Sequence, residues 1–249
     1  MELRVGTSGW HYPHWREHFY PPDVPATRRL EYYSQRFDTV EINNSFYRLP
    51  KPETMREWRD KTPAGFLFAV KGSRFITHNK KLKDPEGPIE RLLPVVDELG
   101  KKLGPILFQL PPGWKVSAER LAHFLDLMPK GYRCAFEFRE PSWENEDIYG
   151  ILKQHNAAVC IFHLAGYESP IQLTADFTYI RLHGPVGKYQ GSYSNKQLRE
   201  WVDRIQSWKR KLKAAYVYFD NDVNAAAVKD AERLRKLLGI SGGGLRRAA

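Results

Sequence analysis

Strand-like and helix-like segments alternate about eight times along the 249-residue chain, which predicts an α/β fold with a parallel sheet. Eight such units close most naturally into a (β/α)8 barrel of the TIM type, for which this chain length is ordinary. The helical segments carry apolar residues three and four positions apart, whereas the strand segments alternate apolar and polar side chains. We therefore predict a single (β/α)8-barrel domain over residues 1–240.

The predicted elements follow one another in a regular order. The strands are Leu3–Ser8, Thr39–Asn44, Phe66–Gly72, Pro105–Leu110, Arg133–Arg139, Ala158–His163, Phe177–His183 and Ala215–Asp220. The helices between most of them are Pro52–Asp60, Pro88–Leu99, Ala118–Met128, Asp147–Gln154, Asn195–Lys213 and Asn224–Leu238. Ser194 followed by Gln197 predicts a capping box at the start of the longest helix.

Two segments depart from the regular repeat. The connection Leu164–Asp176 contains Gly166 and Pro170 and is too short for a full helix, so we expect the sixth helix to be irregular or missing. The Gly-rich, basic tail over residues 241–249 is expected to be disordered.

Cysteine usage and hydropathy indicate the cellular compartment. Cys134 and Cys160 lie in apolar strand-like runs, without a disulfide framework or metal-ligand spacing, which favours a reducing environment. The sequence has no apolar run of about 18 residues, and we expect no cleavable signal. A cytoplasmic protein without a membrane partner is therefore expected, whereas its oligomeric state is not indicated.

The charge balance favours an anionic partner. The chain has 39 Lys and Arg against 29 Asp and Glu, a net charge of +10 and a pI near 9.5. Such a balance is typical of proteins that bind nucleic acid or a phosphorylated small molecule. The alternative is that the basic residues only keep the protein soluble.

Polar residues near the strand ends share one face of the predicted sheet. In the run TYIRLHGP (Thr178–Pro185), Arg181 and His183 point to one side and Ile180 and Leu182 to the other. The same parity in other strands gives an inward polar set: Glu41, Asn43, Lys71, Gln109, Glu137, Arg139, Tyr218 and Asp220. Barrel enzymes hold their sites at this carboxyl end of the strands, so we expect a binding or catalytic site there. The alternative is a buried network in which these charges only neutralise one another.

Seven motifs resemble the YecE-like family of (β/α)-barrel proteins, catalogued as a domain of unknown function. They are VGTSGW (5–10), VEINNSFY (40–47), FAVKGS (68–73), FQLPP (108–112), FEFREPSW (136–143), YIRLHGP (179–185) and YVYFDND (216–222). The resemblance covers Arg4 to Leu238 and implies the barrel, but no activity, because the family has no settled one. It carries a site pattern over to Glu41, Lys71, Gln109, Glu137, Arg139, Trp143, Arg181, His183 and Tyr218. Asp220-Asn221 stands where the resemblance would lead us to expect an Asn-Asn pair, which leaves the role of Asp220 open.

These residues suggest roles in acid–base chemistry on an anion. Glu41 or Glu137 is the candidate general base, and His183 is the candidate acid/base group. The predicted substrate- or anion-binding residues are Lys71, Gln109, Arg139, Trp143, Arg181, Tyr218 and Asn221. Arginine in particular offers a planar fork that matches phosphate or carboxylate.

Metal binding is the weaker interpretation of the same residues. Glu41, Glu137, His183 and Asp220 could offer oxygen-rich ligands of the kind that Mg²⁺ or Mn²⁺ prefers. Lys71, Arg139 and Arg181 share the same mouth and would repel a divalent cation. We therefore predict no tightly bound metal, with loosely held Mg²⁺ or Mn²⁺ as the alternative.

The leading hypothesis is an enzyme that acts on a phosphate-bearing substrate, with hydrolysis of nucleic-acid phosphodiesters as the favoured version. One alternative is isomerase or lyase chemistry on a sugar or sugar acid. Another is a non-catalytic protein that binds nucleic acid or a nucleotide, DNA or RNA.

Overall fold

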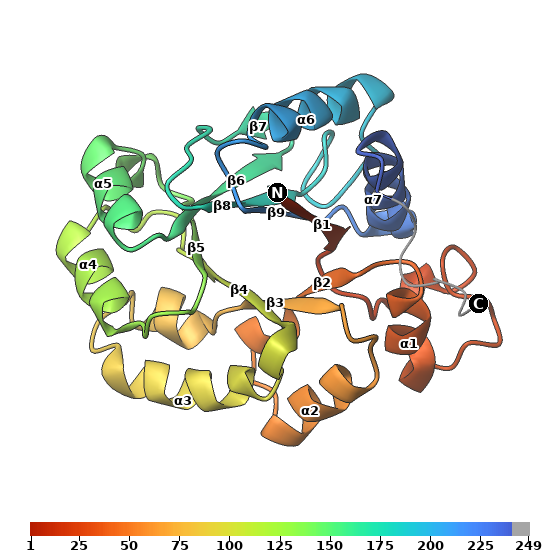
Figure 1. Cartoon of the computed structure of the whole chain (residues 1–249), viewed down its shortest axis with the longest axis horizontal. Coiled ribbons are helices and arrows are strands. Elements are labelled where there is room, and N and C mark those ends of the chain that lie inside the picture. The colour runs from red at the N-terminus through yellow and green to blue at the C-terminus, as the bar shows by residue number, and fades with distance from the viewer. Residues whose placement is uncertain (241–249) are drawn as a thin grey trace.

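A ring of eight parallel strands forms the centre of the structure, a computed structural model that describes residues 1–240 (Figure 1). The strands are β1 (Glu2–Thr7), β2 (Thr39–Ile42), β3 (Leu67–Lys71), β4 (Leu103–Gln109), β5 (Cys134–Glu137), β6 (Ala158–Leu164), β8 (Phe177–Leu182) and β9 (Ala214–Phe219). They are hydrogen-bonded in the order β1-β9-β8-β6-β5-β4-β3-β2. The ring closes between β1 and β2 through one parallel bridge, Ser8 with Glu41, where the Gly9 amide donates to the Glu41 carbonyl over 2.8 Å. The predicted TIM-type barrel is confirmed.

Helices surround the strand ring (Figure 1). They are α1 (Arg29–Ser34), α2 (Pro52–Asp60), α3 (Glu86–Asp97), α4 (Ala118–Leu127), α5 (Glu146–Gln154), α6 (Asn195–Ser207) and α7 (Ala226–Leu237). The capping box that opens α6 is present, with both reciprocal bonds between Ser194 and Gln197. This helix ends six residues before the predicted Lys213, because the chain needs the residues after Ser207 to turn back toward β9.

The prediction of a missing sixth helix is confirmed. After β6 the chain forms only the two-residue strand β7 (Tyr167–Glu168), which pairs antiparallel with the end of β6. Two hydroxyl groups of this connection accept hydrogen bonds from β6 amides, Ser169 from Phe162 and Thr174 from Val159, both over 2.9 Å. A loop can therefore replace a helix here because its side chains satisfy the backbone of the strand.

The strands alternate as the sequence predicts. Side chains such as Val40, Phe68 and Ile180 lie in the large cluster between the strands and the helices. A second cluster fills the barrel interior; it contains Ala69, Leu107, Ala135, Ala158, Cys160, Phe177, Tyr179, Ala214, Tyr216 and Tyr218. Because the lower interior is filled by apolar and aromatic groups, the charged residues gather above it, at the carboxyl ends of the strands.

Three further predictions concern the cysteines, membrane spans and the C-terminal tail. Cys134 and Cys160 are free and buried. Within residues 1–240, no helix combines the length and apolar character needed to cross a bilayer. The tail predicted to be disordered, 241–249, lies outside the described residues.

Candidate functional site

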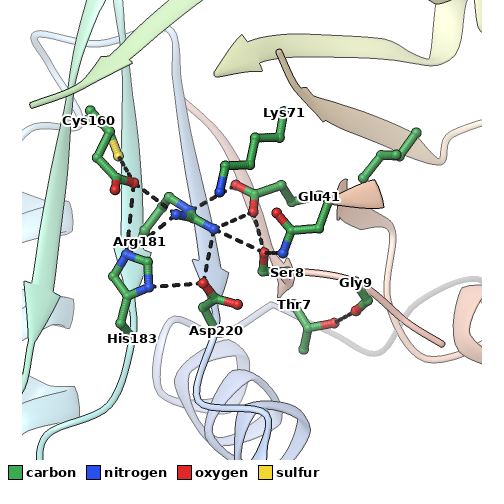
Figure 2. Close-up of polar contacts among 12 residues, drawn as sticks. Thr7, Ser8, Gly9, Glu41, Lys71, Cys160, Arg181, His183 and Asp220 are labelled. Atoms are coloured by element: carbon green, nitrogen blue, oxygen red, sulfur yellow. Dashed lines mark hydrogen bonds and ion pairs between the residues drawn. The ribbon is translucent and has the colours of Figure 1, made fainter. Parts of the chain in front are cut away.

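Arg181 lies at the centre of the charged layer and pairs with carboxylates from three directions (Figure 2). Its Nη1 donates to Glu137 Oε2 over 2.9 Å, and its Nη2 donates to Asp220 Oδ2 over 3.0 Å. Its Nε and Nη2 donate to the two oxygens of Glu41 over 3.1 and 2.8 Å. The guanidinium is 1% exposed, so these carboxylates replace its hydration shell.

The carboxylates and His183 are held by a second set of contacts. Glu41 accepts hydrogen bonds from the Tyr179 hydroxyl over 2.6 Å and from Ser8, and Glu137 accepts from Arg139. His183 Nε2 lies 2.9 Å from Arg139 Nη2, which can only donate, so Nε2 accepts. The other ring nitrogen, Nδ1, lies 2.9 Å from Asp220 Oδ2.

The predicted catalytic residues thus come together, but away from solvent. Glu41 and Glu137 are fully buried, and Arg181 and His183 are each 1% exposed. Their polar atoms are directed at one another, so a substrate in the neighbouring pockets would meet other side chains first. None of these four residues lines the two pockets at this end of the barrel.

Burial and charge act in opposite directions on the buried carboxyl groups. Burial by itself would raise the pKa of Glu137, but the charges of Arg139 and Arg181 outweigh it and hold that pKa well below the usual value. The pKa of Asp220 is also lowered, because Arg181 and a hydrogen bond from His183 outweigh burial. Both groups therefore stabilise the fold in their ionised form.

We expect stability to fall steeply as the pH drops below about 4. A carboxyl whose pKa is lower in the folded chain stabilises it fully above the unfolded-state pKa, and this contribution disappears as the pH falls through the folded-state pKa. Urea unfolding between pH 6 and pH 3 would measure it. Glu137→Gln should flatten the dependence on pH, and an unchanged slope in that variant would contradict the assignment.

A pocket of about 770 Å³ opens beside this network at the carboxyl end of the strands. Lys71 and Asp220 line it together with an aromatic set: Trp10, Tyr12, Tyr47, Trp58 and Tyr189. Lys71 has no ion-pair partner within residues 1–240, and its Nζ lies 4.4 Å from the centre of the Phe46 ring. Burial, followed by the charge of Arg181, lowers the pKa of Lys71. Lys71 is thus a cation available to a ligand.

Asp222 is a pocket residue that the sequence analysis missed. It lines the same pocket as Asp220, and its side chain is 19% exposed. Burial, followed by the charge of Asp220, raises the pKa of Asp222. Two carboxyl groups whose pKa values are displaced in opposite directions are typical of an acid and base pair. The available signal was the spacing of the two acidic residues directly after the last strand, in YFDND.

A second pocket of about 400 Å³ adjoins the first. Gln109 and Arg139 line it, and Tyr189 lines both pockets. Tyr189 belongs to the loop after β8, where its amide donates to the His183 carbonyl over 2.7 Å. The loop folds tightly at Gly184, whose φ is +115° and where a Cβ would lie 2.3 Å from the Gln190 carbonyl oxygen. Tyr189 is therefore a wall between two adjacent pockets.

Besides the buried Arg181, three of the predicted binding residues line neither pocket. Trp143 is fully buried and donates to the Trp114 carbonyl over 2.7 Å. Tyr218 is fully buried in the barrel interior. Asn221 donates to the Gly191 carbonyl over 2.7 Å and to Asp230 Oδ2 over 2.9 Å, and so fixes the loop that carries Tyr189. Their positions indicate structural roles. The alternation of side chains along a strand could not show this, because it does not distinguish a residue that lines a pocket from one that packs behind it.

The weak metal candidates are grouped around a cation instead of an empty space. Glu41, Glu137 and Asp220 all direct oxygens at the Arg181 guanidinium, where a divalent ion bound by them would have to lie. Among residues 1–240, no group of three or more His, Cys, Asp or Glu could hold a metal ion. These four candidates therefore do not form a metal site in this arrangement.

Comparisons with known proteins identify relatives of unknown function. A family model described as "Protein of unknown function DUF72" matches residues 4–249. The UPF0759 protein YunF of Bacillus subtilis is 26% identical over 280 residues, covering 98% of this chain and 97% of that protein. The UPF0759 protein YecE of Escherichia coli K12 is 29% identical over 142 residues, covering 57% of this chain and 50% of YecE. The resemblance to the YecE-like family is thus confirmed.

Solved structures show the same fold. A DUF72 family protein from Thermotoga maritima superimposes with a TM-score of 0.83 at 28% identity, covering 96% of this chain and 100% of that one. One from Enterococcus faecalis gives a TM-score of 0.80 at 19% identity, covering 99% and 100%, and at that identity it shows the fold alone.

Proposed function

Because this chain belongs to the DUF72 family, which has no assigned activity, we propose a function from the site itself: hydrolysis of a phosphodiester in a nucleic acid. The larger pocket would hold the substrate, with Lys71 against the phosphate. The observation that carries the proposal is the position of Lys71, an unpaired cation within the described chain, beside two carboxyl groups in an aromatic pocket.

The cationic residues at this end of the barrel have two different roles. Arg181 is taken up by Glu41, Glu137 and Asp220, so it stabilises the network and does not bind the phosphate. Lys71 remains to stabilise the charge on the phosphoryl oxygens, which is the main requirement of phosphoryl transfer. A desolvated ammonium is more effective in this role than one in water, because the local dielectric is low.

Asp220 and Asp222 supply the two proton transfers. Asp220, ionised and held by Arg181 and His183, takes a proton from a water molecule as its oxygen forms a bond to phosphorus. The phosphorus–oxygen bond to the leaving group breaks, and Asp222, whose pKa is raised, gives a proton to that oxygen. The products are an alcohol and a phosphate monoester, and exchange with solvent restores both carboxyl groups.

The aromatic residues favour a nucleic acid over a small phosphate ester. Trp10 and Trp58 pack edge to face with ring centres 5.0 Å apart, and Tyr47 is 74% exposed at the same pocket. Flat side chains beside a cation suit stacking on bases while a phosphate is held nearby. The net charge of +10 would attract such a strand over a distance.

A panel of labelled single-stranded, duplex and abasic DNA and RNA tests the proposal. We expect retention that weakens steeply with salt, because cations released from the strand drive binding. We also expect cleavage with EDTA present, and parallel reactions with Mg²⁺ or Mn²⁺ would show any added effect of a metal ion. Retention without cleavage would indicate a binding protein. Neither retention nor cleavage in any condition would reject the proposal and favour the sugar isomerase or lyase alternative.

A further inference from the structure

A third cavity lies at the opposite end of the barrel from the candidate site. It measures about 660 Å³, and residues at the amino-terminal ends of the strands line it, among them Arg4 of β1, Leu67 of β3 and Leu103 of β4. This end of a TIM-type barrel ordinarily serves stability alone. A cavity here therefore requires an explanation separate from that of the catalytic end.

The cavity is basic and open. Its lining holds four cationic side chains and one carboxylate: Arg4, Lys101, Lys130, Arg133 and Glu2. A Cβ on Gly100 or Gly131 would have no neighbouring atom within 4 Å, so the turns that carry these glycines leave the space open. Both glycines have positive φ, +54° and +106°, which places the adjacent Lys101 and Lys130 at sharp turns before β4 and β5.

The four cations differ in how far they are already neutralised. Arg4 is paired with Glu2 and Asp38. Within residues 1–240, the Arg133 side chain donates a hydrogen bond to the Tyr216 hydroxyl, and no carboxylate pairs with it. Lys101 and Lys130 are exposed and have no ion-pair partner in the same part of the chain. Three of the four charges are thus available to an anion.

We propose that this cavity binds an anion with more than one phosphate group, such as a linear polyphosphate or the phosphate chain of a nucleotide. The guanidinium of Arg133 matches the geometry of a phosphate, and Lys101 and Lys130 supply mobile point charges at the rim. Lys101 precedes β4, whereas Lys130 and Arg133 precede β5, so an extended anion can contact charges from both connections and should therefore bind more tightly than a single phosphate. The site is independent of the proposed hydrolysis at the other end.

Calorimetric titration of the full chain with tripolyphosphate, pyrophosphate and orthophosphate tests the proposal. Affinity should rise in the order orthophosphate, pyrophosphate, tripolyphosphate. Reversal of two exposed charges, Lys101→Glu with Lys130→Glu, should raise the Kd for tripolyphosphate about tenfold or more. The matched control, Lys196→Glu with Lys229→Glu, makes the same change in net charge on exposed residues in the first turns of α6 and α7, at the carboxyl end of the strands, and should leave the Kd within about twofold.

Two further variants distinguish this cavity from the candidate active site. Arg133→Lys keeps the charge but removes the planar fork, so it should weaken tripolyphosphate binding. Lys71→Met alters only the pocket at the carboxyl end and should leave this binding unchanged. The proposal is overturned if tripolyphosphate does not bind, if both charge-reversal pairs have equal effects, or if Lys71→Met abolishes the binding.

Discussion

Replacing Arg181 with methionine is expected to lower the free energy of unfolding by about 3–5 kcal/mol. The substitution removes the shared partner of Glu41, Glu137 and Asp220 and leaves three carboxyl groups close together, the two glutamates fully buried. Some of them must then bind a proton at neutral pH, because like charges so close cannot all stay ionised. Urea unfolding at pH 7 measures the loss.

A control for Arg181→Met is available on the surface. Arg204→Met breaks a surface ion pair with Glu168, in which the Arg204 side chain is 34% exposed and the Glu168 side chain 32%. This substitution should change the free energy of unfolding by no more than about 1 kcal/mol. The variant Arg181→Met with Glu41→Gln and Glu137→Gln should regain part of the lost stability, since it removes two stranded charges together. If Arg181→Met lowers the free energy of unfolding no more than the Arg204→Met control does, the buried network does not stabilise the fold.

The barrel itself could be predicted because the alternation of apolar and polar side chains can be read within each strand separately. Apolar residues such as Val40 and Ile180 alternate with polar ones along each strand, and both sets occupy the faces that the alternation predicts. Helix α1 was not predicted, because its six residues, Arg29–Ser34, are too few to show a helical period. The early end of α6 at Ser207 depends on the position of β9, which the local pattern does not contain.

The membership of the charged layer could also be predicted, but its internal pairing could not. The alternation of side chains along each strand places Glu41, Glu137 and Arg181 on the inward side of the barrel wall. Whether such groups face a ligand or one another depends on distances across the barrel, which no single strand contains. Lys71 and Asp220 differ from Glu41, Glu137 and Arg181 in that they line the larger pocket.

Asp220→Asn is expected to reduce kcat for strand cleavage by about 10²–10⁴-fold, the usual contribution of a general base. Asparagine has nearly the same shape, and its carbonyl oxygen can still accept the hydrogen bond from Arg181, so the pocket should be retained. Because Lys71 still contacts the phosphate, KM should change little. Asp203→Asn, at an exposed position of α6, is the matched control and should leave kcat unchanged.

The pH dependence of kcat/KM separates the base from the acid. In the wild type, the rate should rise as Asp220 loses its proton and fall at higher pH as Asp222 loses its own, because the pKa of Asp222 is the one that is raised. Asp222→Asn should lower the rate and remove the fall on the alkaline side, whereas Asp220→Asn should remove the rise on the acid side. A profile that keeps both limbs in both variants would exclude this pair as the acid and base. The network around Arg181 would then have to position a different reactive group in the same pocket.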